Sequence, residues 1–144
     1  MAGAMLALIG FFLSLYLWLW KTGVLGTLAC GSGSCDFVQL SEYGELFGQP
    51  VALYGVIGYL GLFATGLWGL QGRWVARREP TVVLAVLSGL GVAFTAYLTY
   101  LEAAVLHAWC RWCLISAAII VAIFASAVAG LWSTRTVSPP AGSR

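Results

Sequence analysis

The four cysteines of this 144-residue chain are the residues whose type and spacing most clearly indicate chemistry. Cys110 and Cys113 form a Cys-x-x-Cys motif, a spacing that suits reversible exchange between a dithiol and a disulfide. At the start of a helix, the positive end of the helix dipole lowers a thiol pKa and makes the thiolate a better leaving group. Cys30 and Cys35 enclose Gly-Ser-Gly-Ser, a flexible loop that can close a disulfide or release one sulfur towards a partner. Together the two pairs predict a relay of electrons through thiols.

Two simpler roles for the cysteines stay open. Two structural disulfides could staple the loops of a membrane scaffold without enzymatic activity, although each pair is local and constrains little of the chain. Four cysteines in two close pairs also resemble the ligands of a zinc ribbon. The wide Gly/Ser spacer argues against zinc, so we expect no metal.

Four long apolar stretches must position these cysteines. The chain is 61% hydrophobic and 8% charged, whereas soluble domains carry about 25% charged residues. The stretches run from Met5 to Trp20, Val51 to Leu70, Thr81 to Leu106 and Leu114 to Trp132. As helices they can cross a hydrocarbon core of about 30 Å. The sequence therefore predicts an all-α membrane protein with a four-transmembrane-helix bundle in contact with lipid. Its net charge of +2 is too small to indicate a nucleic-acid partner.

Positive charge beside these stretches predicts the orientation in the inner (plasma) membrane. Lys21 and Arg111 flank one side, and five arginines flank the other: Arg73, Arg77, Arg78, Arg135 and Arg144. The positive-inside rule then places both termini in the cytoplasm. The outer connections, 21–50 and 107–113, carry all four cysteines on the periplasmic or extracytoplasmic side, where disulfides persist.

The chain divides into a membrane part and a short tail. We expect residues 1–132 to form the four-helix domain, and residues 133–144, rich in Ser, Thr, Gly and Pro, to be a disordered cytoplasmic tail. The first stretch lacks the positively charged start of a signal peptide, because Lys21 is its first charge, so we expect it to remain as a span.

Three segments carry a resemblance to the vitamin K epoxide reductase family. Residues 35–43 (CDFVQLSEY) and 48–59 (GQPVALYGVIGY) resemble the family's first-loop signature. Residues 97–102 (YLTYLE), followed by the Cys-x-x-Cys motif, resemble its third and fourth helices. The resemblance implies a four-helix bundle around a quinone site, which couples disulfide formation in a thioredoxin-like protein to quinone reduction.

The resemblance also implies a role for each cysteine. Cys110 and Cys113 become the active-site pair, with Cys113 nearest the quinone, and Cys30 and Cys35 become the shuttle pair. A reduced partner thiol would attack the loop disulfide at Cys30, and the released Cys35 would attack Cys110. Because no soluble domain follows Trp132, we expect the thioredoxin-like or DsbA-like partner to be a separate protein.

Ser41 matches the family's first-loop Ser/Thr, six residues after the second loop cysteine. It has two interpretations: a hydrogen bond that organises the loop or active site, or the N-cap of a short amphipathic helix over Glu42–Phe47. Such a helix in the long outer loop would lie in the membrane interface and close the quinone pocket.

The predicted quinone site draws on several spans. Val51 and Ala117 stand where the vertebrate enzymes carry an Asn and a Tyr that bind the quinone, so the resemblance is closer to bacterial thiol oxidases than to epoxide reductases. Tyr54 and Tyr97 are further candidates, and menaquinone, ubiquinone and a vitamin K-like quinone stay open. Glu102 is a candidate for proton handling at the quinone, or a carboxylate that extends to the membrane interface.

Overall fold

The computed structural model describes residues 1–27, 34–74 and 77–136. Four helices are long and apolar enough to span a membrane. They are α1 (Ala2–Lys21), α3 (Val51–Leu70), α4 (Glu79–Leu101, continued by a π-helical turn over Glu102–Leu106) and α5 (Arg111–Thr136). The predicted four-helix membrane bundle is therefore confirmed. The last helix runs four residues further than Trp132, into the predicted tail, and residues 137–144 lie outside the described part.

The helices pack around a shared core. Helix α1 contacts α3 and α5, while α4 contacts α5 and α3. The core at their centre consists of Ala7, Tyr59, Leu62, Ile119, Ile120 and Ile123. Small residues allow close approach there: a Cβ on Gly10 would lie 2.3 Å from the Tyr59 ring, and one on Gly91 would lie 2.9 Å from Ile120.

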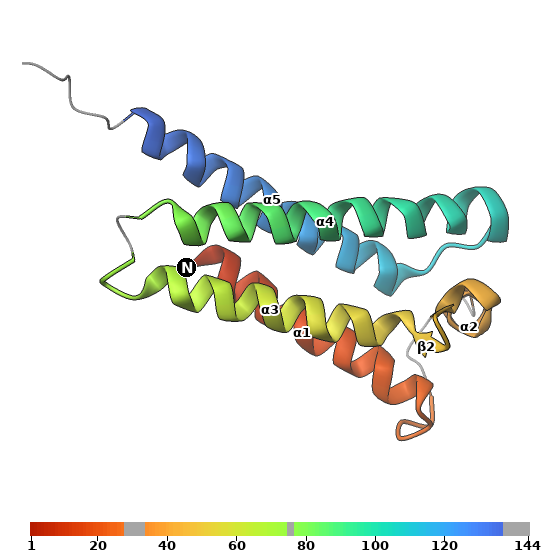
Figure 1. Cartoon of the computed structure of the whole chain (residues 1–144). Helices are drawn as coiled ribbons and strands as arrows, with labels where there is room; N and C mark the ends of the chain where they lie inside the picture. Colours follow the sequence, from red (N-terminus) through yellow and green to blue (C-terminus); the bar gives the residue numbers. More distant parts are fainter. Residues whose placement is uncertain (28–33, 75–76, 137–144) are drawn as a thin grey trace, which may run out of the picture.

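The long loop folds over one end of the bundle. It contains a short helix, α2 (Ser34–Leu40), a 3₁₀ turn (Glu42–Gly44) and a hairpin of β1 (Glu45–Leu46) and β2 (Gln49–Pro50). Figure 1 shows α2 and β2 gathered at the end of the bundle where α1 ends and α3 begins, beside the turn that joins α4 to α5. We call this end the cysteine end.

The predicted helix over Glu42–Phe47 is wrong in its position. The short helix, α2, lies before this segment and ends at Leu40. Ser41 follows it directly, and the Ser41 hydroxyl donates to the carbonyl of Val38, in the last turn of α2, at 2.7 Å. Ser41 makes no side-chain cap bond to the following turn. Phe47 and Gly48 have positive φ values of 54° and 74°, the sign that a two-residue hairpin turn of type I′ requires. The chain therefore reverses where a helix was expected.

Candidate functional site

Cys110 and Cys113 occupy the first turn of α5. Cys110 precedes the first helical residue, its carbonyl accepts from Leu114 N, and its sulfur accepts from Cys113 N at 3.4 Å. Its sulfur therefore sits among the amide donors of a helix N-terminus. The pKa of the Cys110 thiol is lowered from its ordinary value, chiefly by a hydrogen bond with the Cys113 side chain, against the opposing effect of burial. Both cysteines are free thiols here, with Cys110 fully buried and Cys113 half-buried.

Cys35 lies against the same motif. Cys35, Val38 and Cys110 form one buried cluster, covered by Leu106, Ala108, Trp112 and Cys113. Cys35 is 1% exposed and Cys110 0%, so both side chains of this cluster are out of contact with solvent. Cys35 is disulfide-bonded. Cys30, the other member of the predicted loop pair, lies outside the described residues.

Glu102 points into the bundle. It is 3% exposed, and its Oε2 accepts a hydrogen bond from Cys110 N at 3.2 Å. The interpretation of Glu102 as a carboxylate reaching the membrane interface is therefore wrong. The π-helical turn is the reason, because its wider backbone and the left-handed His107 (φ 50°) that ends it bring the chain back over Glu102.

The Glu102 carboxylate and the two thiols could also hold a metal. Their ligand atoms all lie within 4.8 Å of one another. Two thiolates and a carboxylate are ligands that zinc accepts, yet a closed structural zinc site uses four ligands. Since Cys35 is in a disulfide, its sulfur is not a thiolate and does not complete such a site.

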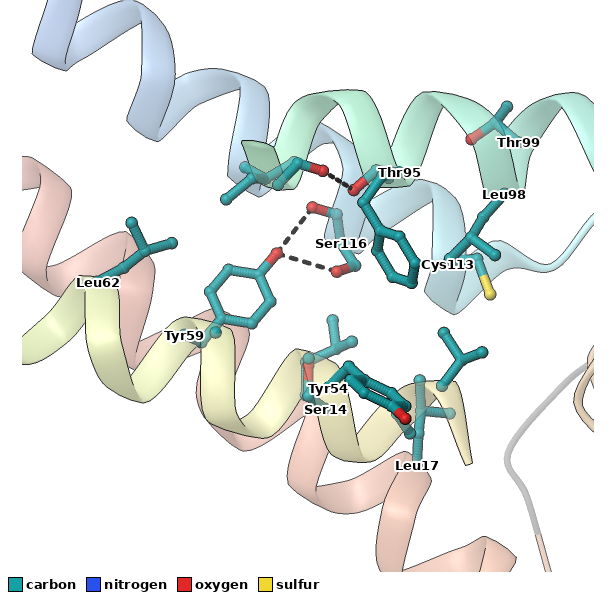
Figure 2. A pocket seen from close by; sticks show the side chains of 18 of the residues that line it. Ser14, Leu17, Tyr54, Tyr59, Leu62, Thr95, Leu98, Thr99, Cys113 and Ser116 are labelled. Carbon is teal, nitrogen blue, oxygen red and sulfur yellow. Dashed lines mark hydrogen bonds between the residues drawn. The ribbon is translucent and has the colours of Figure 1, made fainter. Parts of the chain in front are cut away.

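A mostly apolar cavity of about 190 Å³ runs from this site into the bundle. Its wall includes Cys113, Glu102, Val51 and Tyr54, four of the side chains expected at the quinone site. Tyr97 is not on the wall and is 57% exposed on the outside of α4. Ala117 does not line the cavity either. Figure 2 shows Tyr59 reaching across the cavity from α3 to Ser116 of α5, and Cys113 nearer the cysteine end.

Several hydroxyl groups on the wall already donate to backbone carbonyls. Tyr54 donates to Leu46 O at 2.9 Å and Thr95 to Gly91 O at 2.7 Å. Tyr59 lies 2.9 Å from both the carbonyl and the hydroxyl of Ser116. These groups stiffen the wall and leave fewer donors for a ligand.

Gln39 is a polar wall residue to which the sequence analysis assigned no role. It is 6% exposed, lines the cavity, and places its amide Nε2 3.8 Å from the Cys113 sulfur. A signal for it exists, since it is a polar residue four positions after Cys35, on the same face of α2.

A model of the vitamin K epoxide reductase family matches residues 1–128. Because the match covers most of the 144 residues, the chain belongs to this family, and the resemblance carried by the cysteine motifs is confirmed. Membership supports a quinone-linked thiol oxidoreductase in general, in keeping with the buried cysteine cluster and the apolar cavity. With its four spanning helices, the chain is a multi-pass membrane protein.

Proposed function

We propose that this protein oxidises a separate thioredoxin-like or DsbA-like protein and passes the electrons to a membrane quinone. The observation that carries the proposal is the position of α2, which places Cys35 and Cys110 in one buried cluster while Cys113 lines the cavity. A path for electrons from the loop to the cavity needs both placements. The loop pair is Cys30 and Cys35, and the active-site pair is Cys110 and Cys113.

The proposed exchange conserves electrons at each step. A partner dithiol reduces the Cys30–Cys35 disulfide through a mixed disulfide with Cys30 and leaves oxidised, having lost two electrons and two protons. Cys35 then attacks Cys110, so the Cys110–Cys113 bond breaks and Cys113 leaves as a thiolate with the electron pair. Cys30 next attacks Cys35, which restores the loop disulfide and frees Cys110. Re-forming the Cys110–Cys113 disulfide delivers two electrons and, with two protons, converts quinone to quinol.

The cavity suits the head group of a quinone. Binding sites for drug-sized ligands occupy about 300–1,000 Å³, and this cavity is smaller, at about 190 Å³. We therefore assign it to the ring system, with the isoprenoid tail leaving between helices into lipid. Glu102 lines the cavity, and its carboxylate lies within 4.8 Å of both sulfurs, so we assign to it the transfer of protons that accompany the electrons.

The cysteine end is assigned to the periplasmic or extracytoplasmic face. Support comes from the arginines of the α3–α4 linker, which lies at the opposite end of the bundle (Figure 1), and from the positive-inside rule. Disulfide chemistry at the cysteine end then takes place in an oxidising compartment.

The test is quinone reduction by the purified protein in detergent, driven either by a reduced thioredoxin-like protein or by dithiothreitol. We expect Cys110→Ser and Cys113→Ser to lose both reactions. Cys30→Ser and Cys35→Ser should lose only the reaction driven by the protein, because dithiothreitol can reach the active-site pair directly. If no dithiol drives quinone reduction, a membrane scaffold with structural loop disulfides is the better account.

A further inference from the structure

Two residues on one face of helix α2 lie beside the two cysteines of the Cys-x-x-Cys motif. Cys35 and Gln39 are four residues apart, so they share one face of the helix. Cys35 packs in one cluster with Cys110, and Gln39 Nε2 lies 3.8 Å from Cys113 Sγ. This face of α2 therefore places one residue in the cluster of Cys110 and another at the sulfur of Cys113.

In the second contact the Cys113 sulfur is on the accepting side. An amide nitrogen is only a donor, so the Cys113 sulfur is the acceptor. When Cys110 is engaged by Cys35, its sulfur is in a disulfide and is no longer a thiol that can donate a hydrogen to Cys113. The Cys113 thiolate then needs another donor, and Glu102, the charged group beside it, carries a carboxylate that opposes a second negative charge.

The backbone of Gln39 is fixed from two sides. Lys21 Nζ donates to the Gln39 carbonyl and also pairs with Glu45 at 3.3 Å. Gly44 lies so close that a Cβ there would come within 2.3 Å of the same carbonyl oxygen. These contacts hold the backbone from which the Gln39 side chain extends to Cys113.

We propose that Gln39 is the hydrogen-bond donor that holds Cys113 as a thiolate facing the cavity while Cys35 is joined to Cys110. The inference rests on the proposed function and deepens it, because it assigns a residue to the leaving-group step. In that step the Cys35–Cys110 bond forms, the Cys110–Cys113 bond breaks, and the electron pair stays on Cys113 beside the Gln39 amide. No external oxidant is needed, since this exchange is redox-neutral within the chain.

The test measures the reactivity of Cys113 without quinone or partner. In a Cys110→Ala chain with the loop disulfide intact, which has no side-chain donor at position 110, the rate of Cys113 alkylation by iodoacetamide is followed against pH by peptide mass spectrometry. The groups nearest this thiol are Glu102 and Gln39, with Lys21 and Glu45 behind Gln39. Gln39→Leu should move the midpoint of the profile up by roughly one to two pH units.

Three companion variants sharpen the result. Gln39→Glu replaces the donor by an acceptor and should move the profile further up, whereas Gln39→Asn should restore part of it. Gln49→Leu makes the same chemical change at an exposed position of the same loop and should leave the profile in place. Profiles of Gln39→Leu and Gln39→Glu that superpose on the parent would overturn the inference.

Folding and the wider proposal are controlled separately. Thermal unfolding in detergent shows whether each variant is folded. If Gln39→Leu does not fold, the comparison of Gln39→Asn with the parent still tests the inference. Failure of the parent chain to reduce quinone would count against the proposed function alone, because the alkylation profile needs no quinone.

Discussion

The backbone amide of Cys110 donates a hydrogen bond of 3.2 Å to the carboxylate of Glu102, eight residues earlier in the chain. The backbone carbonyl of Glu102 also accepts from the amides of His107 and Ala108, the latter at 3.1 Å. One residue therefore ties the end of α4 to the start of the Cys-x-x-Cys motif through both its side chain and its backbone. The orientation of Cys110 depends on this connection.

Replacing Glu102 separates its structural role from its proton chemistry. Glu102→Gln keeps an oxygen that accepts from Cys110 N but cannot exchange a proton. We expect it to unfold near the parent temperature and to reduce quinone about 10²-fold more slowly. Glu102→Leu should also lose about 1–3 kcal/mol of stability, because the buried amide is left without its partner. Thermal unfolding and stopped-flow quinone reduction measure the two effects.

The matched control for this carboxylate is Glu79→Gln. Glu79 is an exposed acid at the other end of α4, with 61% of its side chain accessible, and its substitution should change neither measurement. Parental turnover in Glu102→Gln would show that Glu102 only positions the backbone.

Removing Cys30 and Cys113 together should trap the bond between the loop and the active site. In Cys30→Ser/Cys113→Ser, Cys35 can be oxidised onto Cys110, and neither of the two thiols that could resolve the bond is left. We expect a Cys35–Cys110 disulfide to accumulate after reduction and mild reoxidation, seen as a linked peptide pair in non-reducing mass spectrometry. The Cys30→Ser/Cys35→Ser/Cys113→Ser chain is the control and should yield no such pair. Absence of the pair in Cys30→Ser/Cys113→Ser would mean that the placement of Cys35 and Cys110 in one cluster does not lead to exchange.

The spans were predictable because membrane insertion is governed by local composition. An apolar run of sufficient length must form a helix in lipid, since every backbone amide and carbonyl has to be satisfied within the segment. For this reason the predicted bounds of the second span agree with those of α3, Val51–Leu70. The loop followed other rules: the reversal at Phe47 and Gly48 depends on positive φ at a residue type that rarely adopts it.

The site was predictable only in part, because side-chain direction depends on helix phase and on non-local contacts. Phe94, Thr95, Leu98, Thr99 and Glu102 line the cavity from α4, a spacing typical of one helix face. Tyr97 falls off this face, which the period of the helix could have indicated. The position of Gln39 depends on α2, and the inward turn of Glu102 depends on the π-helical turn. The quoted segments that contain these two residues do not specify the direction of either side chain.

The lowered pKa of Cys110 predicts a pH-dependent thiolate in the reduced protein. Its chief cause is the hydrogen bond with the Cys113 side chain, so the thiolate should form below the pH of about 8.5 at which free cysteine titrates. Because the folded pKa is depressed, the resulting stabilisation is present above the unfolded pKa and is lost as the pH falls through the folded value. Cys113→Ala should move thiolate formation to higher pH. Ultraviolet absorbance of the thiolate in a Cys30→Ser/Cys35→Ser background measures it, and an unchanged midpoint would contradict the assigned cause.

The close approach of α1 and α3 makes a prediction about the cavity wall. A Cβ on Gly10 would lie 2.3 Å from the ring of Tyr59, which is 5% exposed and tied through its hydroxyl to Ser116 at 2.9 Å. Gly10→Ala must therefore displace the ring or separate the helices. We expect a loss of about 1–3 kcal/mol of stability and a higher quinone concentration for half-maximal rate, since Tyr59 lines the cavity.

Gly61→Ala is the matched control for this prediction. It makes the same change on α3, at a position where an added Cβ meets no atom within 4 Å. Within a helix, alanine is more favourable than glycine by about 0.5–1 kcal/mol. This variant should therefore be as stable as the parent or slightly more so, with unchanged quinone dependence. Equal melting temperatures for Gly10→Ala and Gly61→Ala would show that the α1–α3 interface yields to a methyl group, and that Tyr59 is not held by that contact.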